Sequence, residues 1–255
     1  MAPLKVHGIV LRYVNYREAD RILTLLTAEM GKISVTARGC RKPRSKLRAA
    51  CDYLVCSEFM LRRVGETLQA TSCAVLDSFF ELRSDYEALC TAFYMRDFCE
   101  TVSGEGQPGG PLFTLLIRCL NALCHAKADP DVVRTAFEIR AMDALGLGPS
   151  LSRCVRCGDE AQPRPMFSVS GGGVVCGRCA GEGGVVTVLP GSVAALRQLR
   201  EIDFDTLPVV TLARAVGRDL AGFWRDYLTW YLDRRFRSAD FAEKLNVFSK
   251  DRLPR

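Results

Sequence analysis

Histidine is scarce in this chain, and the common catalytic motifs are missing. Only His7 and His125 occur among 255 residues, and they lie far apart in the sequence. The chain has no Gly-x-x-x-x-Gly-Lys-Ser/Thr phosphate-binding loop and no Gly-x-Ser-x-Gly nucleophile motif, and its run Gly171–Gly173 lacks the flanking strand, helix and acid of a dinucleotide site. These absences argue against nucleotide-dependent and hydrolytic enzymes, so we expect a binding protein without catalytic activity.

Long hydrophobic runs are missing as well. No segment approaches the roughly 18 to 20 apolar residues that span a membrane, and the opening residues lack the apolar stretch of a secretory signal. We therefore expect a cytoplasmic protein. In that compartment the twelve cysteines predict metal binding or core packing in place of disulfides.

Acidic residues are rare at the start of the chain, and this makes the charge asymmetric. The first 50 residues hold eleven Lys or Arg and only three Asp or Glu, a net charge of +8, whereas the whole chain has a net charge of +6. The entire positive excess therefore lies near the N-terminus. Such a distribution is typical of a surface that binds a polyanion, although a solvated surface that aids solubility is the alternative.

Two different periodicities divide the chain. Up to about residue 76, short segments with partial period-two alternation are separated by turn residues, and five strands in this length favour a small OB-type barrel. A five-stranded sandwich or an SH3-like barrel fits the pattern nearly as well. The expected strands cover residues 4–11, 22–27, 32–38, 53–61 and 68–76.

Helical spacing begins near residue 84. Ser84–Glu87 has the pattern of a capping box and predicts a helix that ends before the glycine-rich loop 103–110. Further helices are expected at about 111–126, from Asp129-Pro130 onward, and at about 211–236. In the last helix one stripe is expected to be core: Leu212, Val216, Leu220, Phe223, Tyr227 and Trp230.

The sharpest motif is a pair of Cys-x-x-Cys turns. Eighteen residues separate Cys157 from Cys176, which is within the spacing of a four-cysteine zinc site. Two such turns close a tetrahedron around Zn²⁺ and leave no position for water, so we predict one structural zinc ion per chain. The alternatives are redox-active dithiols or four unrelated core cysteines. The predicted ligands are Cys154, Cys157, Cys176 and Cys179.

A basic loop follows the third expected strand. Residues 38–48 carry six cations and no acid, and they include Gly39 and Pro43, which favour a loop. Such a loop beside a small barrel can follow a phosphate backbone, with Ser45 adding a neutral hydrogen bond. We therefore predict DNA or RNA contact through Arg38, Arg41, Lys42, Arg44, Lys46 and Arg48. Three tyrosines are available for base stacking, although a half-buried strand position is the preferred interpretation of each: Tyr13, Tyr16 and Tyr53.

In order and spacing these features resemble the RecO family, the bacterial recombination mediators of the RecF pathway. The resemblance covers about residues 4–245. Cys40 departs from the small residue expected there, and this departure puts no role in doubt. The segments that carry the resemblance are Gly8–Leu11, Tyr16–Leu23, Thr27, Gly31–Ile33, Ala37–Gly39 with the basic loop and Ser45, the cysteine segment with Phe167-Ser168 and Gly172-Gly173, Tyr231-Leu232 and Lys244-Leu245.

The resemblance implies an N-terminal OB-fold, a helical domain and an inserted zinc finger in a bacterial, nucleoid-associated protein. It implies binding of single- and double-stranded DNA and annealing of complementary strands coated by single-stranded-DNA-binding protein (SSB). With RecR, such a protein helps to load RecA onto gapped DNA. The resemblance also implies that Arg38, Arg41, Lys42, Arg44 and Lys46 contact phosphates, and that the helical domain binds the acidic C-terminal tail of SSB, for which the candidate anchors are Arg118, Arg134 and Arg140.

The sequence thus predicts an α+β multidomain protein that is not an enzyme. We expect an OB-fold domain over residues 1–80, a helical domain over 81–150 and 190–245, a four-cysteine zinc-binding insertion over 151–189 and a C-terminal tail over 246–255. Two other functions stay open. One is an RNA-binding or RNA-modifying zinc protein, and the other is a basic scaffold protein that binds acidic partners.

Overall fold

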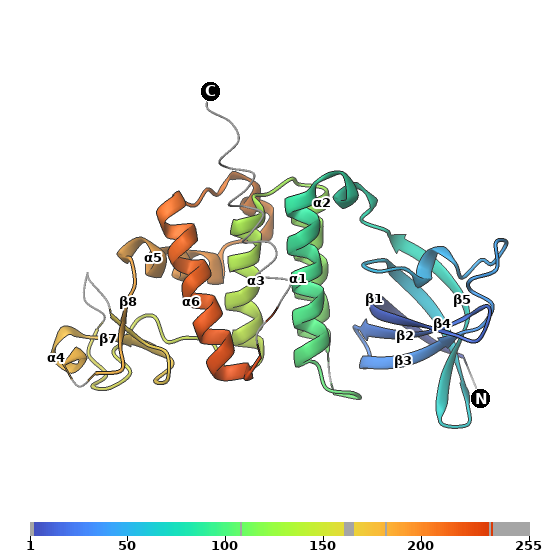
Figure 1. Cartoon of the computed structure of the whole chain (residues 1–255), viewed down its shortest axis with the longest axis horizontal. Coiled ribbons are helices and arrows are strands. Elements are labelled where there is room, and N and C mark those ends of the chain that lie inside the picture. Colours follow the sequence, from blue (N-terminus) through green and yellow to red (C-terminus); the bar gives the residue numbers. More distant parts are fainter. Residues whose placement is uncertain (1–2, 108, 161–165, 182, 235, 237–255) are drawn as a thin grey trace. The chain divides into compact units, whose positions relative to one another are not determined.

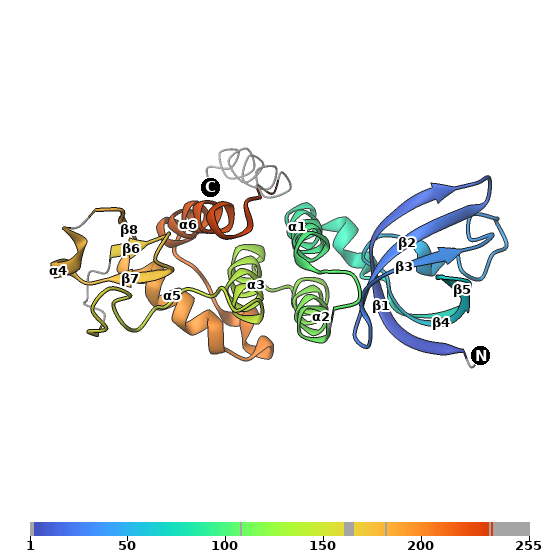
Figure 2. The same cartoon turned by 90° about the horizontal axis from the view of Figure 1, so that it is seen from below.

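The computed structural model describes residues 3–107, 109–160, 166–181, 183–234 and 236. The described residues up to Cys124 form one compact unit, and those from His125 onward form a second; Figures 1 and 2 show the elements of both. The expected tail over 246–255 lies outside the described residues, as do Lys244 and Leu245.

Five strands close into a barrel in the first unit (Figure 1). Around the barrel the order is β1-β2-β3-β5-β4. Neighbouring strands are antiparallel except β3 and β5, which run parallel. This arrangement confirms the predicted OB-type barrel. The strands are β1 (Leu4–Tyr16), β2 (Asp20–Thr27), β3 (Gly31–Ala37), β4 (Cys56–Val64) and β5 (Thr67–Asp77).

The barrel core follows from the alternation seen in the sequence. In β3 every second residue from Gly31 to Ala37 is buried, because successive side chains of a strand point to opposite faces. Val35, Phe59 and Leu61 are completely buried in the barrel, and each contributes about 1.5–3 kcal/mol relative to an exposed position. β1 is longer than predicted. A register shift between Val10 and Arg12 marks a bulge, which bends a long strand and lets it continue.

Two helices complete the first unit: α1 (Tyr86–Val102) and α2 (Gly110–Cys124). They overlap in Figure 1 and lie side by side in Figure 2. The predicted capping box at Ser84 is wrong. Ser84 ends the short 3₁₀ turn η2 (Phe80–Ser84) and donates its hydroxyl to the carbonyl oxygen of Glu81. Asp85 is the N-cap, and its carboxylate accepts a hydrogen bond of 3.0 Å from the Ala88 amide.

The second unit is built from three longer helices and a small sheet. The helices are α3 (Pro130–Ala144), α5 (Pro190–Glu201) and α6 (Arg214–Leu232). Asp129 caps α3 as the sequence predicts, because its carboxylate accepts from the amides of Asp131 and Val132. The sheet has the order β7-β6-β8. The remaining elements are β6 (Met166–Ser168), β7 (Gly173–Val175), α4 (Gly177–Ala180), β8 (Val186–Thr187) and the 3₁₀ turn η3 (Phe204–Val209).

Aromatic contacts join the small sheet to α6. Phe167 of β6 meets Phe223 of α6 at 4.7 Å and Tyr227 at 6.0 Å between ring centroids, both edge to face. The Tyr227 hydroxyl donates 2.9 Å to the carbonyl oxygen of Leu147. Phe167 and Tyr227 are each 1% exposed, so this cluster is the core of the second unit near the cysteine motif.

The predicted stripe on the last helix is wrong at both ends. Leu212 precedes α6, and Trp230 is 61% exposed. The buried face includes Trp224 and Leu228, which rotates the inward side of the helix away from Trp230. No helix within the described ranges is both long and apolar enough to cross a membrane.

Candidate nucleic-acid interface and metal centre

The basic loop, residues 38–48, leaves β3 with buried anchors on one side and cations on the other. Cys40 and Leu47 are buried in the barrel core. The 3₁₀ turn η1 (Ala49–Cys51) follows and buries Ala50 and Cys51. These apolar anchors hold the loop against the barrel. All six predicted DNA-contacting side chains of this loop are exposed: Arg38, Arg41, Lys42, Arg44, Lys46 and Arg48.

Hydrogen bonds fix the start of the basic loop against the β1–β2 turn. The Gly39 amide donates 2.7 Å to the carboxylate of Asp20, and Gly39 has φ +65°, a conformation that glycine adopts without strain. The Arg41 amide donates to the carbonyl of Ala19 at 3.0 Å, and its guanidinium donates to the carbonyl of Glu18 at 2.9 Å. The loop is therefore presented in a fixed shape, which lowers the entropy lost on binding.

The second half of the basic loop is a series of tight turns. The Ser45 amide donates to the Lys42 carbonyl at 3.0 Å, and the Arg48 amide donates to the Ser45 carbonyl at 3.2 Å. Ser45 Oγ accepts from the Leu47 amide at 3.3 Å. The serine oxygen therefore shapes the loop, and its O–H group can donate a hydrogen bond to a phosphate oxygen.

Two of the tyrosines considered for base stacking contact other side chains of the same unit. Tyr13 and Tyr53 stack on each other with centroids 4.4 Å apart. The Arg21 guanidinium lies 3.8 Å from the Tyr13 centroid, and Arg96 lies 4.7 Å from that of Tyr53. A ring and a guanidinium this close occupy opposite faces of Tyr13, so a base has no face there to stack on. Tyr16 is 43% exposed.

Arg21 is a member of the basic surface that the sequence did not indicate. It lies on β2, outside the basic loop, and its Nη1 donates 2.6 Å to the carbonyl oxygen of Cys51. Arg21 lines one pocket together with Cys40, Arg41, Arg48 and Asp52. Its sequence position gave no signal, because the chain must fold before β2 and the loop end meet.

The three arginines considered as anchors for an acidic tail differ in their surroundings. Arg118 lies on α2 of the first unit and is exposed. Arg134 on α3 is buried and pairs with Asp131 at 3.2 Å. Arg140 donates a hydrogen bond of 3.0 Å to the carbonyl of Leu199, and its guanidinium lies over the Phe204 ring. Arg134 and Arg140 therefore stabilise the second unit through internal contacts.

The four cysteines of the motif converge. Their sulfur atoms all lie within 4.8 Å of one another, and Cys157 and Cys176 are 3.6 Å apart. A tetrahedral metal with bonds of about 2.3 Å to sulfur places its ligands about 3.8 Å apart. The cluster could therefore bind a metal ion, as the spacing of the motif predicted.

Backbone amides prepare this cluster for a cation. Burial opposes ionisation of Cys154, but amides of Cys176, Cys157 and Arg156 point at its sulfur and lower its pKa to about 6. The Cys179 amide likewise lowers the pKa of Cys176 below its ordinary value. Hydrogen bonds from the neighbouring thiols raise the pKa of Cys179 to about 12. The shifts therefore divide the cluster, because Cys157 also has a raised pKa, whereas Cys154 and Cys176 ionise more readily than ordinary thiols, as metal-binding cysteines do.

Two further contacts fix the cysteine turns. Arg156 donates to the carbonyl oxygens of Cys179 and Gly183 and ties one turn to the other. Gly173 passes so close to Val155 that an added Cβ would lie 2.5 Å from its side chain. The small core around the cluster consists of Cys154, Val175 and Cys176, with Val155, Cys179 and Val185 packed against it.

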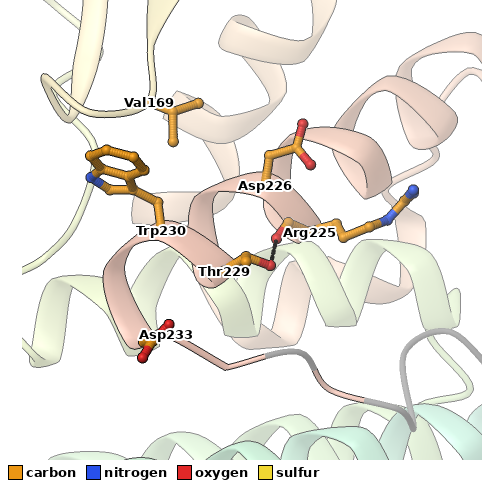
Figure 3. A pocket seen from close by; sticks show the side chains of 6 residues that line it. All are labelled: Val169, Arg225, Asp226, Thr229, Trp230 and Asp233. Carbon is orange, nitrogen blue, oxygen red and sulfur yellow. Dashed lines mark hydrogen bonds between the residues drawn. The ribbon is translucent and has the colours of Figure 1, made fainter.

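The exposed side of α6 borders a hollow of a different character (Figure 3). Trp230 and Val169 supply its apolar surface, and the Thr229 hydroxyl donates 2.7 Å to the carbonyl oxygen of Arg225 in its own helix. Its charged side chains are Arg225, Asp226 and Asp233. Because both signs are present, this hollow lacks the uniform positive field that a polyanion needs.

These observations define an OB-fold protein with an exposed basic loop, followed by a helical region that carries a four-cysteine cluster. Residues 1–79 match the family model "Recombination protein O N terminal", and residues 83–240 match "Recombination protein O C terminal". The chain therefore belongs to the RecO family, and the resemblance seen in the sequence is confirmed.

Curated relatives extend over nearly the whole chain. The chain is 36% identical over 251 residues to the DNA repair protein RecO of Anaeromyxobacter dehalogenans, an alignment that covers 96% of this chain and 98% of that protein. It is 32% identical over 244 residues to the DNA repair protein RecO of Acetivibrio thermocellus, with 95% and 97% covered. The similarity thus spans both the barrel and the helical region.

Proposed function

We propose that this protein is a recombination mediator that binds single- and double-stranded DNA and anneals complementary strands coated by SSB. Together with RecR it assists the loading of RecA. The observation that carries the proposal is the basic loop. Six exposed cations lie on a segment that hydrogen bonds and buried anchors hold to a closed OB-type barrel. Its family membership supports the same role.

Annealing requires no bond-making residue. Two strands repel each other through their phosphates, and a surface that neutralises phosphates lowers this repulsion and releases counterions. Guanidinium and ammonium groups on a fixed loop supply this effect without contacting base edges, which carry the sequence information. Binding is therefore expected to depend steeply on salt and hardly on sequence.

The four-cysteine cluster is proposed to hold one zinc ion through Cys154, Cys157, Cys176 and Cys179. When bound, Zn²⁺ supplies four strong bonds to thiolates and thus cross-links the module. The soft sulfur donors and the lowered pKa of Cys154 and Cys176 fit this ion. Because all four positions are taken by protein, the role is structural.

The partner proteins are proposed from the family. An acidic SSB tail needs exposed cations in the helical region, and of the three candidate anchors Arg118 is the exposed one. Arg134 and Arg140 make contacts within the second unit, so their replacement is expected to lower stability as well as any affinity for the tail.

Annealing of SSB-coated complementary strands by the purified protein tests the proposal. We expect the wild type to anneal them and a variant with Arg41→Ala, Lys42→Ala and Arg44→Ala to anneal far more slowly. Glu66→Ala, an exposed change in the β4–β5 turn, is the folding-neutral control. A wild type that retains no DNA at low salt would contradict the proposal and favour a scaffold for acidic proteins.

A further inference from the structure

A small pocket at the basic loop is lined by three arginines, one from a barrel strand and two from the opposite ends of the loop. Arg21 comes from β2, Arg41 from the start of the loop and Arg48 from its end, and Cys40 and Asp52 complete the lining. The cavity measures about 260 Å³. Three guanidinium groups and one carboxylate give it a net charge of +2 at neutral pH. Among the described residues, no aromatic or aliphatic side chain contributes to the lining, so a base would find no surface to stack on.

Arg21 is held in place before any ligand arrives. Its Nη1 donates to the Cys51 carbonyl at 2.6 Å, its Nε donates to Asn15 Oδ1 at 3.4 Å, and its guanidinium covers the ring of Tyr13. Neither of these bonds uses Nη2. A fixed guanidinium loses little entropy on binding, and its planar donors match two oxygens of one phosphate.

The other members of the pocket are placed by the backbone. Both the backbone and the side chain of Arg41 are hydrogen-bonded. Its amide donates to the carbonyl oxygen of Ala19, and its guanidinium donates to the carbonyl oxygen of Glu18. Arg48 is exposed and precedes η1. Burial raises the pKa of the Cys40 thiol above its ordinary value, so the pocket carries no thiolate at neutral pH.

Asp52 opposes an anion and limits the charge of the pocket. Its Oδ1 accepts 2.9 Å from the Tyr53 amide, and its Oδ2 lies 4.0 Å from Arg83. These contacts lie outside the pocket lining. The carboxylate still cancels one of the three positive charges, so its removal is expected to strengthen the attraction of an anion.

We propose that Arg21, Arg41 and Arg48 form a seat for a single phosphate group of a nucleic-acid strand. The proposal rests on the proposed function and adds a defined point of attachment to a surface that otherwise binds phosphates diffusely. The phosphate can be an internal diester or the monoester at a strand end, and both offer the same oxygen atoms to the three guanidinium groups. A seated phosphate would fix the register of the strand on the barrel.

The test measures binding of the full-length protein to a short oligothymidylate labelled at its 3′ end, by fluorescence anisotropy. One form of the oligonucleotide carries a 5′ phosphate and the other a 5′ hydroxyl. Sodium phosphate replaces sodium chloride at equal ionic strength in a parallel series. The pocket variants are Arg21→Gln and Arg48→Gln. Arg44→Gln is the matched control, because it removes a cation of the same loop that does not line the pocket.

Each replaced cation should weaken binding about fivefold at roughly 0.1 M salt, since one phosphate contact contributes about 0.7 to the slope of log affinity against log salt on single strands. For the wild type and Arg44→Gln, sodium phosphate should weaken oligonucleotide binding more than sodium chloride of the same ionic strength. For Arg21→Gln and Arg48→Gln, the two salts should weaken binding equally. Asp52→Asn should increase the difference between the two salts, because it removes the negative charge that opposes phosphate. Equal losses with both oligonucleotides identify an internal phosphate, and a loss confined to the phosphorylated one identifies the strand end.

The proposed phosphate site would be refuted if phosphate and chloride weakened binding of the wild type equally. It would also be refuted if the difference between the two salts were unchanged in both pocket variants. A combined Lys42→Gln, Arg44→Gln and Lys46→Gln variant separates this outcome from failure of the proposed function. If that variant loses DNA while the pocket variants do not, the basic loop binds DNA and the seat is absent. Because Arg21→Gln also removes a bond to Cys51, its melting temperature is measured, and the exposed Arg48→Gln keeps the test valid if Arg21→Gln unfolds.

Discussion

Removal of one cysteine from the four-cysteine cluster should unfold the small module and weaken the helices that support it. Small zinc modules derive about 10–16 kcal/mol of apparent binding free energy from the metal at pH 7. The core of this module consists largely of the cluster itself, so little apolar packing remains without the ion. We therefore expect Cys157→Ser to release the proposed zinc ion and to disorder β6, β7 and α4.

The cost to the rest of the second unit can be estimated from Phe167. This ring is 1% exposed and contacts Phe223 and Tyr227 of α6. If β6 unfolds with the module, α6 loses its packing against this buried ring, and the free energy of unfolding falls by about 3–5 kcal/mol. For a unit of this size that loss corresponds to a fall in melting temperature of roughly 10–20 °C.

The assay combines zinc quantification with thermal unfolding followed by circular dichroism. Cys90→Ser is the matched control, because Cys90 is half-buried on α1 outside the cluster. We expect the control to retain one zinc ion per chain and the Cys157→Ser protein to contain none. A Cys157→Ser protein with full zinc content and an unchanged melting temperature would refute the assignment of the ligands.

Three further predictions concern stability. Asp129→Ala should cost about 1 kcal/mol in urea unfolding, because its carboxylate accepts two amides at the start of α3; no loss would mean that the cap is redundant. Slight burial raises the pKa of Glu29, but hydrogen bonds from His7 outweigh it and hold the pKa below its ordinary value of 4.5. This carboxylate therefore stabilises the fold above pH 4.5 and stops doing so as the pH falls through its folded pKa, so His7→Ala should shift acid unfolding to higher pH, and an unshifted midpoint would count against the contact. Trp230→Ala should change the free energy of unfolding by less than about 0.5 kcal/mol, and a larger loss would restore this residue to the core.

The elements that the sequence predicted correctly depend on local patterns. Alternation of apolar residues marked the strands, and the spacing of Cys157 and Cys176 predicted that the two Cys-x-x-Cys turns meet in one cluster. Both patterns can be recognised in the sequence because the residues that form them, alternate residues of a strand and two cysteines three positions apart, lie close together along the chain. The basic loop was visible because its cations are consecutive or nearly so.

The features that the sequence did not predict depend on contacts between distant residues. Arg21 becomes part of the basic surface only when its guanidinium meets the Cys51 carbonyl. Trp230 is exposed because Trp224 and Leu228 set the inward face of α6. Ser84 and Asp85 are both good caps, and the choice between them follows from the 3₁₀ turn that Ser84 ends. Local propensity alone does not decide such cases.

The most direct test of the basic loop is the salt dependence of single-stranded DNA binding. The wild type is compared with the variant in which Arg41, Lys42 and Arg44 are replaced by alanine. If these side chains contact phosphates, the slope of log affinity against log salt should fall by about 2 in magnitude, and affinity should drop equally for unrelated sequences. An unchanged slope with unchanged affinity, or a loss confined to one sequence, would contradict the account.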